Sequence, residues 1–213
     1  MYYALRLNLP TLYWSADAED FETVERAAAA VTGVTMREVA QDYAKYEDDL
    51  SFLDNVRFVY GDSPTYDDLV LDLAAYHEIQ GEFPKVLVID NLMNVSGEQE
   101  NEWASMRDTA KVIHKLTRIT GAAVFVLHHA SDDRTDPSVP APRKSLQGKI
   151  SQLPKAIWSV ALANNGTELR LCPVKNRWAG ADPTGNDYVT LYADPGRSRI
   201  YNDRTSFLAG NPA

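Results

Sequence analysis

The stretch KVLVIDNLMNV, residues 85–95, decides the fold of this chain. Four apolar residues, 86–89, follow one another without interruption and end at a single carboxylate, Asp90. An uninterrupted run rich in β-branched residues is typical of a strand that is buried on both faces. The stretch therefore predicts a strand in the middle of a parallel sheet.

Asp90 lies where such a strand ends. In open parallel sheets, ligands bind outside the carboxyl ends of the strands. An Asp at that place can hold Mg²⁺, directly or through water, while the ion carries phosphate oxygens, which is the form of a Walker B element. The alternative is that Asp90 only caps the following turn, and this short pattern does not separate the two interpretations.

The rest of the chain alternates strands and helices. Apolar runs predict strands over residues 9–15, 56–60, 86–89, 122–127, 156–162, 168–174, 188–192 and 199–201. Amphipathic helices are expected between the first four strands, one of them opened by a capping-box pattern at Thr65 and Asp68. Asn164-Asn165-Gly166 predicts a hairpin turn. This order predicts an α/β fold with a parallel sheet and an antiparallel extension at its C-terminal edge.

Length and composition agree with one globular domain. The chain has 213 residues, which we expect to form a single domain over 1–204 and an irregular tail over 205–213. It has a single cysteine, Cys172, in an apolar strand pattern, so we expect a buried thiol and no disulfide. We see neither a signal peptide nor an apolar stretch of the roughly 20 residues that span a membrane, and expect a cytoplasmic protein without membrane contact.

Charge is distributed unevenly along the chain. The net charge is −9, yet residues 134–204 carry 11 Lys and Arg against 6 Asp and Glu. Residues 1–105 have the opposite balance, with 6 Lys and Arg against 21 Asp and Glu. This asymmetry permits a local contact between the C-terminal third and a polyanion such as a nucleotide or nucleic acid.

Polar residues follow three of the predicted parallel strands, at Asp17, at Asp90 and at His128-His129. A polar segment over 131–155 comes next, and loops of that length inside a compact domain are often functional. Its basic residues include Arg134, Arg143, Lys144 and Lys149. After the hairpin, Lys175 and Arg177 share one face of a strand.

This succession resembles the RecA-like ATPase core of hexameric helicases, and most of all the DnaB-type replicative helicases and the RepA-type ATPases of bacteriophages and plasmids. The resemblance covers about residues 9–201 and implies a three-layer RecA-like fold of the P-loop NTPase type. It also implies the cofactors ATP and Mg²⁺, single-stranded DNA as partner, assembly into a homo-oligomeric hexamer, and a role in DNA replication.

The resemblance also assigns roles around the nucleotide. TLYWSADAED looks like the second core strand, which places Asp17 as the catalytic base, or Glu19 if the shorter Asp side chain reaches less well. KVLVIDNL is similar to Walker B, with Asp90 as the Mg²⁺ ligand and Asn91 beside it at the nucleotide. VFVLHHAS resembles the sensor strand, with His128 or His129 coupling the γ-phosphate to DNA.

The basic residues receive two further roles. PVKNRW looks like the Lys-x-Arg finger, so Lys175 and Arg177 would stabilise phosphoryl charge in a neighbouring subunit. The segment with Arg134, Arg143, Lys144 and Lys149 matches the region that family members turn toward DNA.

One family motif is missing. The phosphate loop G-x-x-x-x-G-K-[ST] should precede the strand that contains Leu12, but the eleven residues before Leu12 contain neither Gly nor Lys. The backbone amides and the lysine that cradle phosphates are therefore absent. Either the P-loop belongs to another polypeptide of a split or truncated helicase, or this RecA-like fold no longer binds ATP well.

Other interpretations remain open from the residues alone. A non-hydrolysing binding or loader module of the same fold, which partners an active ATPase, is the main alternative. A metal-dependent phosphoesterase using Asp17, Asp90 and His128 is weaker, because dense ligand motifs are lacking. The two histidines also fit a structural pair at a strand end, and Lys175 and Arg177 fit solvated surface charges.

Overall fold

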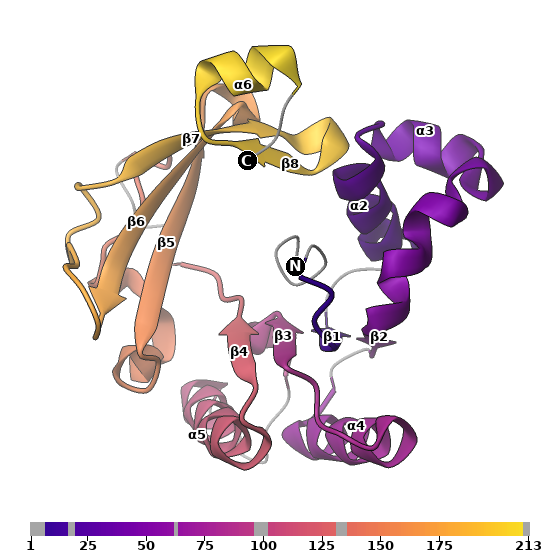
Figure 1. Cartoon of the computed structure of the whole chain (residues 1–213). Coiled ribbons are helices and arrows are strands. Elements are labelled where there is room, and N and C mark those ends of the chain that lie inside the picture. The colour runs from indigo at the N-terminus through magenta and orange to yellow at the C-terminus, as the bar shows by residue number, and fades with distance from the viewer. Residues whose placement is uncertain (1–6, 17–19, 62–63, 96–101, 131–135, 211–213) are drawn as a thin grey trace. The chain divides into compact units, whose positions relative to one another are not determined.

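The computed structural model describes residues 7–16, 20–61, 64–95, 102–130 and 136–210. The chain divides into two compact units (Figure 1), the first over residues 1–32 and 42–128 and the second over 33–41 and 129–213. The sequence predicted one domain over 1–204. Each of the two units has its own sheet, and the single domain over 1–204 stays a prediction.

The first unit has a four-stranded parallel sheet in the order β2-β1-β3-β4. Its strands are β1 (Thr11–Ser15), β2 (Val56–Tyr60), β3 (Val86–Asp90) and β4 (Ala123–Val126). The predicted central strand is confirmed, since Leu87 and Ile89 of β3 are 0% exposed. Because the register pairs Ser15 with Asp90, the carboxyl ends of β1 and β3 lie together.

The helices of this unit are α2 (Asp20–Thr32), α4 (Tyr66–Gln80) and α5 (Glu102–Thr120). The capping box predicted at Thr65 is confirmed, because its side chain accepts from the Asp68 amide while the Asp68 carboxylate accepts from the Thr65 amide. Gly81 ends α4 in the left-handed conformation, at φ 75°. Of the helices in the described part of the chain, none is long and apolar enough to cross a membrane.

Two expectations for this unit differ from the structure. Between the first two strands, where the sequence predicted amphipathic helix, residues 36–54 form α3 (Met36–Gln41), which belongs to the second unit, and 3₁₀ helices over Tyr43–Tyr46 and Asp48–Asn55. Their many Asp residues favour turns over α-helix, because the short side chain competes for backbone hydrogen bonds. The apolar run over residues 122–127, a pattern typical of a buried strand, forms β4, but much of β4 is exposed because it lies at the end of the sheet.

The second unit has an antiparallel sheet in the order β5-β6-β7-β8. Its strands are β5 (Ala156–Ala163), β6 (Glu168–Asn176), β7 (Val189–Asp194) and β8 (Arg199–Tyr201). The predicted hairpin is confirmed, and Asn165 and Gly166 adopt positive φ at its turn. These strands form a sheet of their own in the described residues, whereas the sequence predicted an extension of the parallel sheet.

Two segments predicted to be irregular contain helical turns. Residues 204–209 form α6 (Arg204–Ala209), because Asp203 caps its first turn and Gly210 ends it in the left-handed conformation. The described part of the 131–155 segment has 3₁₀ helices over Arg143–Ser145 and Gln147–Gln152, with Ile150 buried. Cys172 is buried, as predicted.

Candidate functional site

The carboxyl ends of β1 and β3 hold Asp90 in place. The backbone amide of Ala16 donates to the Asp90 carbonyl at 2.6 Å, so the two strands stay joined past their last paired residues. The Tyr13 hydroxyl, from the middle of β1, donates to Asp90 Oδ2. A carboxylate offers about four acceptor positions, and Tyr13 takes one of them.

Tyr13 is a buried residue whose ring packs on Phe58 of β2, with ring centroids 5.6 Å apart. Burial raises the pKa of the Tyr13 phenol, and the hydrogen bond to Asp90 raises it further. The hydroxyl therefore stays protonated and remains a donor at neutral pH. Nothing in the sequence indicates this pair, because 77 residues separate the two side chains.

Asn91 holds the turn that follows Asp90. Its Oδ1 accepts hydrogen bonds from the amides of Met93 at 2.9 Å and Asn94 at 3.3 Å. Asn94 Nδ2 donates in turn to the carbonyl of Ala16 at 2.9 Å. The contacts of this buried side chain make Asn91 a helix cap that fixes the turn after Asp90.

A magnesium ion fits Asp90, whereas the phosphates of ATP do not fit this chain alone. Mg²⁺ is usually bound by one or two carboxylates together with waters and phosphate oxygens. Asp90 offers one such carboxylate at the carboxyl end of β3, while Asp17 and Glu19 lie outside the described residues. No phosphate loop occurs in the sequence, and a cluster of three metal-ligating side chains is absent from the described residues.

The two histidines lie just after β4. The Leu127 amide before them donates to the Ile89 carbonyl at 2.9 Å, which ties this end of β4 to the end of β3. His128 is half-buried and is the last residue of the first unit, whereas His129 is exposed and begins the second stretch of the second unit. Their sensor role stays a prediction.

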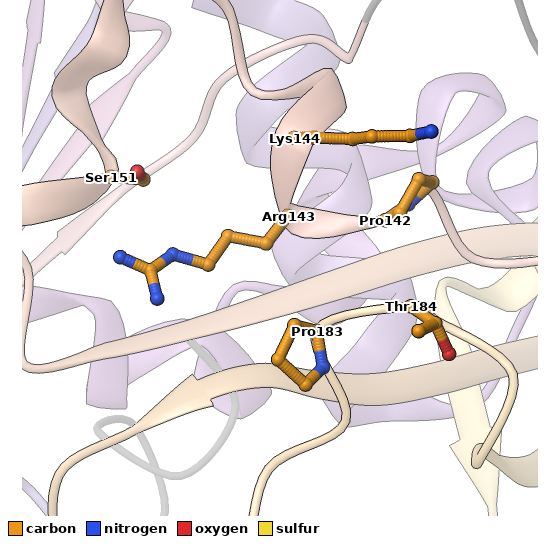
Figure 2. Close-up of a pocket in the computed structure, with 6 residues that line it drawn as sticks. All are labelled: Pro142, Arg143, Lys144, Ser151, Pro183 and Thr184. Atoms are coloured by element: carbon orange, nitrogen blue, oxygen red, sulfur yellow. The ribbon is translucent and has the colours of Figure 1, made fainter.

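A second group of predicted residues gathers around a pocket in the second unit. The pocket has a volume of about 560 Å³ and is lined by Pro142, Arg143, Lys144, Ser151, Pro183 and Thr184 (Figure 2). Figure 2 shows the Arg143 side chain extending toward Ser151, while Lys144 points the opposite way. The Arg143 amide donates to the Pro183 carbonyl at 2.9 Å and so joins the two walls.

Lys175 and Arg177 of the predicted finger lie near the same wall. Lys175 Nζ donates to the carbonyls of Ser151 at 2.6 Å and Gln152 at 3.0 Å, and Arg177 donates to Gln152 at 3.5 Å. Burial lowers the pKa of Lys175, and the positive charges of Arg143 and Arg177 lower it further. Like charges held this close favour an anion between them.

The sequence predicted separate roles for Arg143 and for the Lys175–Arg177 pair, whereas the structure places this pair beside Ser151 and Gln152, and Ser151 lines the pocket together with Arg143. Nothing in the sequence indicated the wall at Pro183 and Thr184. That wall is shaped by Asp182, whose carboxylate accepts from the amides of Thr184, Asn186 and Asp187. The Asp-Pro-Thr-Gly order indicated a turn but gave no sign of a pocket. Arg134 lies outside the described residues, as does the side chain of Lys149.

A parallel sheet covered by helices, with a carboxylate at the carboxyl end of a central strand, defines a RecA-like core. The chain belongs to the AAA domain family, whose family model matches residues 6–135.

Two phage proteins are similar over most of the chain. The Gene 65 protein of Mycobacterium phage D29 is 30% identical over 200 residues, which are 89% of this chain and 86% of that protein. The Gene 65 protein of Mycobacterium phage L5 is also 30% identical over 200 residues, covering 75% of its length.

Solved structures share the fold at low sequence identity. A DnaB-like replicative helicase, whose structure was described with its interactions with primase, matches with a TM-score of 0.76 at 11% identity over 92% of this chain. The chain spans about half, 52%, of that helicase chain. A separately solved ATPase domain matches with a TM-score of 0.76 at 12% identity, and the match covers 93% of this chain and 76% of that one.

Proposed function

We propose that this chain is the Walker B-bearing part of a DnaB-type DNA helicase that acts in phage DNA replication, in the cytoplasm of the infected cell. In this proposal it works within a hexameric ring on single-stranded DNA, and a phosphate loop comes from upstream sequence or from another polypeptide. The observation that carries the proposal is the position of Asp90, at the carboxyl end of the central strand of a helicase-like core.

The roles of the chain's own residues follow from that position. Asp90 would hold Mg²⁺, which neutralises phosphate charge when nucleotide is bound. Tyr13 orients the carboxylate through its hydrogen bond, and Asn91 fixes the turn behind it. Asp17 or Glu19 would orient the attacking water, and His128 or His129 would sense the γ-phosphate.

The basic pocket would bind phosphate groups. Arg143 and Lys144 line it, and Lys175 and Arg177 lie at its Ser151 side. These cations would have one of two roles. They would contact the DNA backbone, or they would stabilise nucleotide charge in a neighbouring subunit. Both roles need the cluster of positive charges that lowers the pKa of Lys175.

A titration with a fluorescent ATP analogue and Mg²⁺ tests the Asp90 assignment. Asp90→Asn is the informative variant, because an amide oxygen still accepts from Tyr13 while the charge is gone. The matched control is Asp108→Ala, which removes an exposed carboxylate paired with Lys111 on α5. We expect Mg²⁺-dependent binding that Asp90→Asn weakens and Asp108→Ala leaves unchanged.

Two results would contradict this assignment. Equal binding by Asp90→Asn and the original chain would exclude Asp90 as the magnesium ligand. Absence of binding, both for the chain alone and with a phosphate-loop polypeptide added, would exclude the ATPase function and leave the second candidate. That candidate is a non-hydrolysing binding or loader module, favoured by the missing phosphate loop in the sequence.

DNA binding is tested with Arg143→Ala/Lys144→Ala and a fluorescent oligothymidylate, by anisotropy at several salt concentrations. If both side chains contact phosphates, the slope of log affinity against log salt should fall by about 1.4. The control, Lys115→Ala/Arg118→Ala, removes two exposed cations of α5 in the first unit and should leave the slope unchanged. An unchanged affinity of the Arg143/Lys144 variant would refute the DNA role of the pocket.

A further inference from the structure

Trp178 follows β6 in a short exposed segment over residues 177–180. Trp178 is 72% exposed, whereas Trp14 of the parallel sheet is 2% exposed. Tryptophan is highly buried on average in folded proteins, because burial of its large ring is favourable. Single exposed apolar side chains are nevertheless common, so the surroundings of this ring decide what it can bind.

Two hydrogen bonds fix the main chain that carries the ring. The Trp178 amide donates to Asn176 Oδ1 at 3.0 Å. The Asp182 amide donates to the Pro173 carbonyl at 3.0 Å and closes the segment at its base. A ring on a fixed main chain loses less conformational entropy when it binds a flat partner, so the segment is preorganised for such a contact.

Positive charges lie next to the ring. Arg177 is exposed, and its contact with the Gln152 carbonyl, at 3.5 Å, takes one of the five N–H donors of the guanidinium. The charges of Arg143 and Arg177 both act on Lys175, which places these three cations in one neighbourhood. An aromatic face beside cations is a pattern with which proteins bind single-stranded nucleic acid, because bases stack on the ring while phosphates contact the cations.

We propose that Trp178 is a stacking platform for a base of single-stranded DNA, with Arg177 at the phosphate beside that base. The inference rests on the proposed function, and it adds a contact with bases to the phosphate contacts proposed above. Because the two residues are adjacent in the chain, one strand can meet both side chains. Every base has an aromatic face, so this contact adds affinity without selecting a sequence.

The experiment uses fluorescence anisotropy to compare oligothymidylate with an oligonucleotide of the same length in which abasic sites replace the bases. Trp178→Leu keeps an apolar side chain and removes the aromatic face, whereas Trp178→Phe keeps a ring. Tyr43→Leu is the matched control, because it removes an exposed ring from a 3₁₀ helix of the first unit. Thermal unfolding followed by circular dichroism checks that each variant folds.

We expect Trp178→Leu to weaken the binding of oligothymidylate by about fivefold or more, with Trp178→Phe between that variant and the original chain. Tyr43→Leu should bind like the original chain. The abasic oligonucleotide should bind the original chain and Trp178→Leu equally, since it offers no base to stack.

Two further signals distinguish stacking from phosphate contact. The slope of log affinity against log salt should stay unchanged in Trp178→Leu and should fall by about 0.7 in Arg177→Ala. Oligothymidylate should also quench the tryptophan fluorescence of the original chain, and Trp178→Phe should remove most of that quenching.

Three results would overturn the proposal. The first is equal binding of oligothymidylate by folded Trp178→Leu and by the original chain. The second is an equal loss of affinity for the abasic oligonucleotide, which would show that the ring only supports the fold of its segment. The third is a loss of ATP-analogue binding in Trp178→Leu with unchanged oligonucleotide binding, because the base of a free nucleotide would then be the occupant.

The outcomes also separate this inference from the proposed function. Binding that depends on Arg143 and Lys144, but neither on Trp178 nor on bases, would support the DNA role of the pocket and contradict the stacking contact. Binding that depends on Trp178, without ATP-analogue binding even when a phosphate-loop polypeptide is added, would support the contact and contradict the ATPase function. Absence of any oligonucleotide binding would refute both the contact and the DNA role of the pocket.

Discussion

Replacement of Tyr13 by Phe removes the hydroxyl that donates to Asp90 Oδ2 and keeps the ring that packs on Phe58. A hydrogen bond to a charged partner contributes about 1.5–3 kcal/mol to the free energy of unfolding. Asp90 is only partly buried, so water can replace part of the lost contact. We therefore expect the lower end, a loss of about 1.5 kcal/mol at neutral pH.

Urea unfolding measures this loss, with circular dichroism and tryptophan fluorescence as the two signals. Trp14, buried in β1, reports on the first unit. In a chain of this size a loss of that magnitude should lower Tm by about 3–6 °C. A double-mutant cycle isolates the pair, because Tyr13→Phe should cost much less when Asp90 is already Ala. We expect a coupling energy of about 1 kcal/mol or more.

Two findings would refute the reasoning. If Tyr13→Phe changed the free energy of unfolding by less than about 0.5 kcal/mol, the hydrogen bond would not stabilise the fold. If the cost were the same in the Asp90→Ala background, the hydroxyl would act through some group other than Asp90.

Three more predictions follow from named contacts. Thr65→Ala should lower the free energy of unfolding by about 1 kcal/mol through loss of the α4 cap, whereas Thr65→Ser should leave it unchanged. If urea unfolding gave the same loss for both variants, the cap would be excluded as the cause. Gly185→Ala should cost about 3 kcal/mol or more, because φ is +81° and a Cβ would lie 2.3 Å from the Pro140 carbonyl oxygen. Gly180→Ala, where a Cβ meets nothing within 4 Å, is the control, and similar melting temperatures for both variants would contradict this account. Burial raises the pKa of Tyr13 above the unfolded value of about 10, so its contribution is complete below about pH 10 and lost as pH rises further. The original chain should then lose more stability than Tyr13→Phe above about pH 10, and parallel pH curves would rule this out.

Local patterns in the sequence were sufficient for the individual elements. The apolar run before Asp90 predicted β3, the Thr65–Asp68 spacing predicted the cap of α4, and Asn164-Asn165-Gly166 predicted the hairpin turn. Each of these depends on residues that are close in the chain, so the forces that determine them are visible in a short window of sequence. The position of Asp90 at a strand end was predicted for the same reason.

The arrangement of side chains from distant parts of the chain was decided by the tertiary structure alone. The Tyr13–Asp90 hydrogen bond needs two strands in register, and the basic pocket needs the Arg143 segment, Ser151 and the wall at Pro183 to meet. The apolar run of β4 has the sequence pattern of a buried strand. That pattern shows that the strand needs neighbours to cover it, but it does not show whether this chain contains them. Only the sheet order shows that β3 is covered on both sides while β4 ends the sheet with Phe125 exposed.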